Sequence, residues 1–233
     1  MTWKTTARTA SRRRVLGLTG LASLPVVTGC GAGTGRGKAE APAPAPEPVH
    51  AGDDVVMIVR HAEKPAGTSA PYGITADGVR SEGSLTVRGW TRAGALAGLF
   101  APAGDAPVRA GLARPAAVYA AAPDGDKEQR PLQTVSALAA RLGLTVITSH
   151  AKGGEAALAA ELAVRHGPTL VSWQHEDIPA IADGLGLVSP APPGSWPGDR
   201  FDVVWVFVRS GQGWTFRQVP QLLLDGDRPT VIA

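Results

Sequence analysis

Arg60 and His61 stand side by side at the end of an unbroken apolar run, residues 55–59. An arginine side chain offers a planar fork of donors suited to phosphate or carboxylate, and a histidine can act as a nucleophile, a base or a metal ligand. A short β-branched run is typical of a strand buried on both faces of a parallel sheet. Open α/β sheets bind their ligands at the carboxyl ends of such strands, so the pair predicts an anion-binding site.

A second arginine, Arg130, precedes Pro131 at the predicted start of a helix. Proline suits the first helical position, which makes Arg130 the expected N-cap residue. A cation at the positive end of a helix is locally unfavourable, and an anion shared by the helix amides and the guanidinium would remove that conflict. We therefore expect Arg130 to bind the same anion; the alternative is a solvated surface arginine.

A second histidine, His175, follows another apolar run, residues 169–173, and Glu176 comes directly after it. If 169–173 is also a parallel strand, His175 lies at the same sheet edge as His61. The alternative is a loop histidine satisfied by its neighbours. His50 is expected to be a solvated linker residue, and His150 and His166 to be structural.

The elements that must position these residues alternate between strand and helix, which predicts an α/β domain with a mostly parallel sheet. The size of the domain allows a three-layer sandwich. A helix capped by Thr86 is expected to run to Phe100. Further strands are predicted at 116–121, 144–148 and 169–173, further helices at 130–142, 155–165 and 179–185, and a closing edge hairpin at 203–208 and 214–219.

These motifs resemble those of the histidine phosphatase superfamily, relatives of the cofactor-dependent phosphoglycerate mutases. Residues 60–63, Arg-His-Ala-Glu, are similar to the family's opening signature. Residues 85–93 resemble its Leu-Thr-x-x-Gly-x-x-Gln-Ala segment, with Arg92 in place of Gln. Residues 130–134 resemble its Arg-Ala-x-Gln-Thr-Ala segment, although the usual preceding Ser-Pro is missing and the loop from Pro123 is longer.

The resemblance implies a phosphoglycerate mutase-like fold and a metal-independent phosphomonoester hydrolase that needs no cofactor. His61 would form a phosphohistidine, Arg60 and Arg130 would bind the phosphate oxygens, and His175 would add a donor. The substrate would be a small phosphorylated molecule. We expect its specificity to lie in residues 66–83 and in the Pro-rich loop 190–198.

The leaving oxygen also needs a proton. Glu176 is the first choice for the donor, because an acid follows the second histidine in the acid phosphatase branch of the family. That branch usually has Asp there and a much larger helical insert than this chain can hold. Glu82 is the second choice, and the third is an acid of the next loop, Asp124, Asp126 or Glu128. Glu63 and Lys64 are expected to brace the site, with Glu63 orienting Arg60 through a salt bridge.

The N-terminus indicates export. Residues 1–29 combine a twin-arginine type segment with a short apolar core and end in a lipobox-like Val-Thr-Gly before Cys30, the only cysteine of the chain. We expect a signal peptide, a lipid anchor on Cys30, a Gly/Pro/Ala-rich tether over 30–52 and a domain over 53–233. The protein would then lie at the extracytoplasmic face of the cell membrane, held there by the lipid alone.

Charge argues against nucleic acid as a partner. Residues 1–29 hold five of the 23 basic residues and no acidic one, so the rest of the chain has 18 basic and 20 acidic residues. The basic balance therefore belongs to the targeting segment. The sequence does not indicate an oligomeric state.

Two other readings use the same residues. His61, Glu63, His175 and Glu176 could ligate a metal in a hydrolase, but no His-x-His or His-Glu-x-x-His spacing occurs. A surface lipoprotein could instead bind a phosphorylated or other anionic ligand without turning it over. A mutase is disfavoured, because a cell-surface lipoprotein has little access to sugar phosphates.

Overall fold

A computed structural model describes residues 49–50, 52–104 and 106–233 of the chain. The predicted signal peptide, Cys30 and most of the predicted tether lie outside the described residues. The described residues belong to one compact unit, Pro44–Ala233. Within them, no helix has both the length and the apolar character that crossing a membrane requires.

The centre of this unit is a seven-stranded sheet of order β3-β2-β4-β1-β6-β7-β5. The first four strands of that order run parallel, β6 is antiparallel to both of its neighbours, and β5 is parallel to β7. The strands are β1 (Val55–Arg60), β2 (Ala117–Ala120), β3 (Val146–Ile147), β4 (Pro168–Trp173), β5 (Val188–Ser189), β6 (Val203–Ser210) and β7 (Gly213–Pro220).

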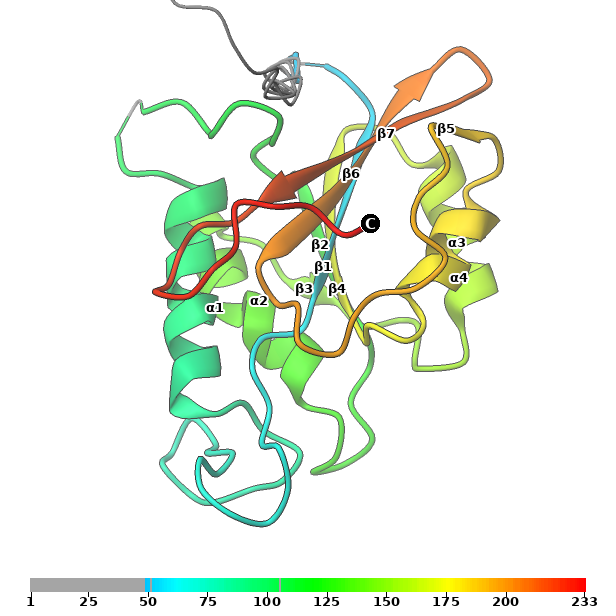
Figure 1. Cartoon of the computed structure of the whole chain (residues 1–233). Coiled ribbons are helices and arrows are strands. Elements are labelled where there is room, and N and C mark those ends of the chain that lie inside the picture. The colour runs from blue at the N-terminus through cyan, green and yellow to red at the C-terminus, as the bar shows by residue number, and fades with distance from the viewer. Residues whose placement is uncertain (1–48, 51, 105) are drawn as a thin grey trace, which may run out of the picture. The chain divides into compact units, whose positions relative to one another are not determined.

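Helices cover both faces of the sheet, with α1 and α2 on one side and α3 and α4 on the other (Figure 1). They are α1 (Val87–Phe100), α2 (Arg130–Leu142), α3 (Glu155–Val164) and α4 (Ile178–Gly184). Strand β1 is apolar from Val55 to Val59 because both of its faces are buried: Met57 packs in the core under α1 and α2, whereas Ile58 packs in the core under α3 and α4. The predicted α/β three-layer sandwich with a mostly parallel sheet is confirmed.

The C-terminal hairpin differs from the prediction. It was expected to be an edge pair, but β6 pairs with β1 in the middle of the sheet, and its residues 203–207 are all buried. The edge is formed by β5, a two-residue strand too short to leave a sequence pattern. The strand predicted at 144–148 is likewise reduced to Val146–Ile147, because it has only β2 as a neighbour.

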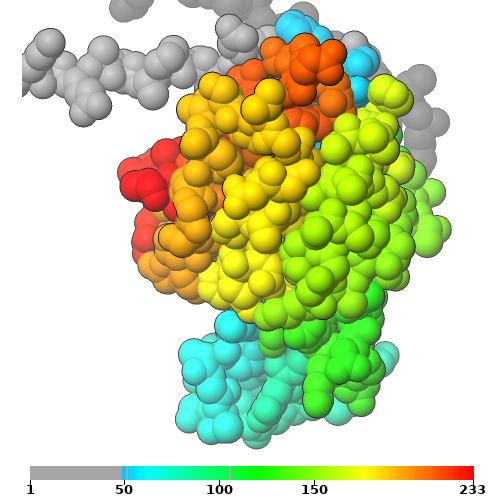
Figure 2. All heavy atoms as spheres, turned by 90° about the vertical axis from the view of Figure 1, so that its right-hand side faces the viewer, coloured from blue at the N-terminus to red at the C-terminus, as the bar shows by residue number. Residues whose placement is uncertain are grey.

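The carboxyl ends of β1, β2 and β4 lie together at the lower edge of the sheet in Figure 1. The segments that follow β1 and β2 project from this edge and lie against each other, as Figure 2 shows in cyan and green. At Gly83 the two segments are so close that a Cβ would lie 2.2 Å from the carbonyl oxygen of Asp126. The predicted site residues therefore gather where the fold brings three strand ends together.

Candidate active site

Arg60 ends β1 and is 1% exposed. Its Nη1 donates to the carbonyl oxygens of Gly198 at 2.6 Å and Arg200 at 3.3 Å, and its guanidinium carbon lies 3.8 Å from the centre of the Phe201 ring. Its Nε and Nη2 are buried and have no partner among the described residues. One edge of the guanidinium is thus held by the 197–201 loop, and the edge that could bind an oxyanion with two parallel hydrogen bonds is unpaired.

His61 follows Arg60 and is held from both sides. Its backbone N–H donates to the carbonyl of Trp173 at 2.9 Å, and its Nδ1 lies 2.8 Å from the carbonyl oxygen of Ala62. Because a carbonyl can only accept, Nδ1 carries the proton and Nε2 keeps its lone pair. Burial, with smaller effects of Arg60 and Arg130, lowers the pKa of His61 from 6.5 to about 3. The imidazole is therefore neutral and oriented, with the lone pair of Nε2 available.

The backbone after His61 is fixed by two helix starts. The N–H of Ala62 donates to the Thr134 hydroxyl at 2.8 Å, and that hydroxyl donates to the carbonyl of Arg130 at 2.7 Å. The carbonyl of Glu63 accepts from the N–H of Thr86, the predicted and observed N-cap of α1, at 3.0 Å. The segments that resemble family motifs therefore hold the strand end in place.

Glu63 does not orient Arg60, and that prediction was wrong. Its carboxylate pairs with Arg92 at 2.8 Å and with Arg88 at 3.1 Å, both on α1. The side chain reaches α1 because Gly89 lets the helix approach: a Cβ there would lie 2.5 Å from the carbonyl oxygen of Glu63. Arg92, which departs from the family pattern, is the main partner of Glu63.

Arg130 is the first residue of α2, and Gln129 is the N-cap, one residue earlier than predicted. Its Nη1 donates to the carbonyl of Glu82 at 3.0 Å, and its Nε is buried and has no partner among the described residues. Burial lowers the pKa of Arg130. The charge of Arg130 also lowers the pKa values of His61 and Lys64, which places the three groups in one electrostatic neighbourhood.

His175 lies beside the loop that holds Arg60. A Cβ at Gly198, whose carbonyl accepts from Arg60, would lie 3.5 Å from the Nε2 of His175. The Nδ1 of His175 lies 2.6 Å from a carboxylate oxygen of Glu176, in an orientation that makes no hydrogen bond. Burial, followed by the charge of Arg60, lowers the pKa of His175. The second histidine therefore stands next to the first arginine.

The electrostatics of Glu176 argue against its predicted role as proton donor. Its carboxylate pairs with Lys152 at 2.7 Å. Burial alone would raise the pKa of Glu176, but the hydrogen bond from Lys152 and nearby charges outweigh it and lower the pKa to about 2. Glu176 is therefore ionised at neutral pH. Lys152 was not found from the sequence, because a single lysine in a loop leaves no signal.

The neighbouring Asp177 has the opposite character. Burial raises its pKa, and its Oδ2 is buried and lies 3.6 Å from Nζ of Lys152, too far for a hydrogen bond. It is the N-cap residue of α4, yet its side chain makes no capping bond. The other donor candidates from the sequence lie on the two projecting segments: Glu82, Asp124 and Asp126 are exposed, and Glu128 has a left-handed backbone with φ of 53°.

The four residues of the metal-site reading do not come together as a ligand set. Glu63 is engaged by α1, and Glu176 by Lys152. The described part of the chain contains no group of three or more His, Cys, Asp or Glu side chains arranged to hold a metal ion. His150 and His166 lie within hydrogen-bond distance of carboxylates of their own, Glu161 at 2.7 Å and Asp54 at 2.9 Å.

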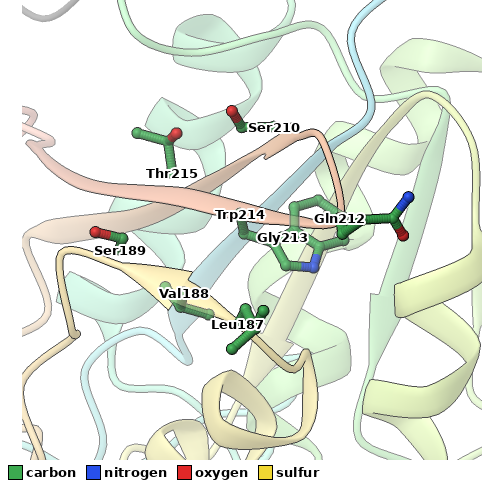
Figure 3. A pocket seen from close by; sticks show the side chains of 8 residues that line it. All are labelled: Leu187, Val188, Ser189, Ser210, Gln212, Gly213, Trp214 and Thr215. Atoms are coloured by element: carbon green, nitrogen blue, oxygen red, sulfur yellow. The ribbon is translucent and has the colours of Figure 1, made fainter.

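Two hollows flank Arg130. One of about 480 Å³ lies between the loops after β2 and β3 and includes Lys152, and one of about 510 Å³ lies between residues 75–84 and 126–133. A third hollow, of about 390 Å³, lies beside β5 and the turn of the hairpin (Figure 3). Its lining has no titratable side chain and consists of Leu187, Val188, Ser189, Ser210, Gln212, Gly213, Trp214 and Thr215. This third hollow therefore offers no titratable group for acid–base chemistry.

No family model and no curated protein matches this chain. Among solved structures, it is similar to one described as "Putative Phosphohistidine Phosphatase SixA" from Nakamurella multipartitia, with 21% identity, 72% of this chain and 95% of that chain covered, and a TM-score of 0.41. It is also similar to "Mycobacterial hydrolase 2", with 14% identity, coverage of 72% and 90%, and a TM-score of 0.40. Similarity at this level carries no statement about function.

Proposed function

We propose that this protein is a phosphatase of the histidine phosphatase type, which hydrolyses phosphomonoesters through a phosphohistidine on His61. The observation that carries the proposal is the buried, unpaired Nε–Nη2 edge of Arg60, next in the chain to a neutral imidazole whose Nδ1 is engaged by the carbonyl of Ala62, which leaves the lone pair on Nε2. Buried donors without partners are costly unless a ligand supplies the acceptors. A phosphoryl group supplies acceptors for Arg60 and an electrophile for His61.

The reaction would proceed in two displacements at phosphorus. Arg60 and Arg130 would bind the nonbridging oxygens, and Nε2 of His61 would attack in line as the bond from phosphorus to the leaving oxygen breaks. Water would then attack the phosphohistidine, breaking the bond from phosphorus to nitrogen, losing a proton and releasing phosphate. His175 would donate a hydrogen bond to the oxygens on which charge develops. No metal or cofactor enters this scheme.

The leaving oxygen would take its proton from Asp177 rather than from Glu176. A general acid must be protonated before it reacts. Burial raises the pKa of Asp177 despite the nearby charge of Lys152, which favours its protonated form, whereas the hydrogen bond from Lys152, against the effect of burial, lowers the pKa of Glu176. Glu176 would instead fix Lys152 and stand beside His175. This assignment replaces the choice made from the sequence.

The place of action would be the extracytoplasmic face of the membrane. The twin-arginine segment and the lipobox before Cys30 support export and lipidation. The substrate would be a small phosphorylated molecule that reaches the domain outside the cytoplasm. Labelling with a radioactive fatty acid tests the anchor, because Cys30→Ser should abolish incorporation.

A binding lipoprotein is the second candidate, and the Lys152–Glu176 pair favours it. If no carboxyl group can protonate the leaving oxygen, the site would hold a phosphorylated or other anionic ligand without turnover. Such a protein would bind inorganic phosphate with the same arginines.

Hydrolysis of an aryl phosphate, measured with and without a chelator, separates these functions. We expect chelator-resistant turnover that is lost in His61→Ala and kept in His166→Ala, a matched histidine outside the site. Acid-labile phosphate should be trapped on wild-type protein and not on His61→Ala. Phosphate binding without turnover would favour the binding protein, and turnover abolished by the chelator would exclude the scheme above.

A further inference from the structure

Gln174 lies between Trp173 and His175, and neither the sequence motifs nor the scheme above uses it. Its side chain is 5% exposed, and both its Nε2 and its Oε1 are buried without a hydrogen-bond partner among the described residues. A buried amide left unpaired at both ends destabilises the folded protein. A ligand in the site would explain why this chain keeps it.

The register of the sheet places Gln174 beside His61. Arg60 of β1 pairs in parallel with Trp173 of β4, and the next backbone bond runs from His61 to the carbonyl of Trp173. His61 and Gln174 are therefore the first residues after two adjacent strands. Neighbouring strands lie about 4.8 Å apart, which brings the two side chains within reach of one ligand.

The alternation of side chains also puts them on one face. Along β1, Val59 packs in the core under α1 and α2, and one further step of the alternation past Arg60 would place His61 on that side, where the charge of Arg130 acts on it. Along β4, Leu170 packs in the same core and Trp173 in the opposite one, so Ser172 and Gln174 point to the side of α2. This is the face on which Thr134 holds Ala62 and Arg130 begins α2.

We infer that Gln174 is a phosphoryl-binding residue: its amide N–H donates to an oxygen of the group attacked by His61. This inference rests on the proposed function. The amide oxygen would accept from a donor of the liganded site, such as the open Nε of Arg130. Gln174 would thus add a neutral hydrogen-bond donor to the three donors already proposed, Arg60, Arg130 and His175.

The test uses Gln174→Met, which keeps the length of the side chain and removes its polar atoms. Without ligand, the variant should melt about 2–6 °C above the wild type, because an unpaired amide has been removed. In calorimetric titrations it should bind inorganic phosphate about tenfold to a hundredfold more weakly, since a hydrogen bond to a charged group is lost. Gln174→Ala provides the same comparison if the Met variant does not fold.

Gln218→Met is the matched control. The amide of Gln218 is satisfied by the backbone of Ile232 at 2.8 and 3.0 Å, on β7. This variant should melt below the wild type and bind phosphate with unchanged affinity. A Gln174→Met protein with phosphate affinity within twofold of the wild type would overturn the role of Gln174 and leave the proposed function standing. A wild type that neither binds phosphate nor hydrolyses the ester would overturn both.

Discussion

The protonation of His61 gives a prediction at the scale of one residue. Its pKa is lowered to about 3, first by burial and then by nearby cations. The folded state should therefore keep this imidazole neutral from pH 7.5 down to about pH 4.5, whereas in the unfolded chain it titrates near 6.5. ¹⁵N spectra of the His61 ring, compared with His61→Ala to assign the signals, should show Nδ1 protonated and Nε2 unprotonated across this range.

The same shift links His61 to stability. Because the folded pKa is depressed, the unfolded state binds more protons between about pH 3 and 6.5, so stability should fall as the pH decreases through that window. Replacing His61 by Gln removes this proton-linked term. As the pH decreases from 6.5 to 3, the melting temperature of the wild type should therefore fall more steeply than that of His61→Gln. Melting temperatures that fall equally with pH in both proteins would contradict the assigned pKa.

Replacing each of the neighbouring acids Glu176 and Asp177 by its amide, one at a time, tests which one donates the proton. Glu176→Gln should lower the turnover of an alkyl phosphate less than tenfold, because an ionised carboxylate has no proton to give. Asp177→Asn should lower it about 10²–10⁴-fold, the usual contribution of a general acid. With an aryl phosphate, whose leaving group needs no proton, the Asp177→Asn defect should shrink. A larger defect in Glu176→Gln than in Asp177→Asn would restore the donor chosen from the sequence.

At the scale of single residues, the sequence predicted the groups that lie at or just after the ends of strands. Arg60, His61 and His175 each follow an apolar run, so their common edge could be deduced from topology alone. The missed groups have no such context. Lys152 is set by a two-residue strand and a loop, and Asp177 and Gln174 were hidden by the stronger signal of their neighbour His175. The partner of Glu63 was misassigned because α1 packs closely enough to capture it.

At the scale of elements, the approach of α1 to the end of β1 depends on Gly89. A Cβ would meet the carbonyl oxygen of Glu63 at 2.5 Å, so Gly89→Ala should destabilise the domain by about 1–3 kcal/mol, as overpacking does. Gly94 on the same helix has open space around its Cα. Gly94→Ala should therefore stabilise by about 0.5–1 kcal/mol through helix propensity. Urea unfolding of both variants checks the pair, and equal effects would contradict this packing.

The elements themselves were predictable where periodicity is strong. The helix from Thr86 and the parallel strands β1 and β4 follow from capping and unbroken apolar runs. The role of the hairpin was not predictable: β7 alternates between buried and exposed positions, as an edge strand does, whereas β6 is buried on both faces because it lies beside β1. Strand order is decided by long-range packing, which a local pattern does not record.

At the scale of the whole described unit, the C-terminal segment 221–232 ties together the two walls of the site. Arg200, whose carbonyl accepts from Arg60, donates to the carbonyls of Thr230 and Val231 at 2.6 and 3.4 Å. Asp227 pairs with Arg92 at 2.7 Å, and Arg92 in turn holds Glu63. A segment with no catalytic group thus supports the arginine on one side and the strand end on the other.

Removing the ion pair between Asp227 and Arg92 should lower both the stability of the fold and the activity. Asp227→Asn should cost about 2–3 kcal/mol, since hydrogen bonds to charged groups contribute about 1.5–3 each. It should also reduce aryl phosphate turnover, because Glu63 and the backbone after His61 lose their support. Asp225→Asn, the same charge change on an exposed side chain of this segment, is the control and should leave both unchanged.

The effect of Asp227→Asn should depend on pH in a defined direction. Burial alone would raise the pKa of Asp227, but the bonds from Arg92 and from the amides of Leu223 and Leu224 lower it below 3.8. A depressed carboxyl pKa contributes stability above the unfolded value and loses it as the pH falls through the folded one. The gap in unfolding free energy between wild type and variant should therefore be full at pH 7 and narrow below about pH 3.8. A gap that stays constant on acidification would show that Asp227 holds the site by its shape and not by its charge.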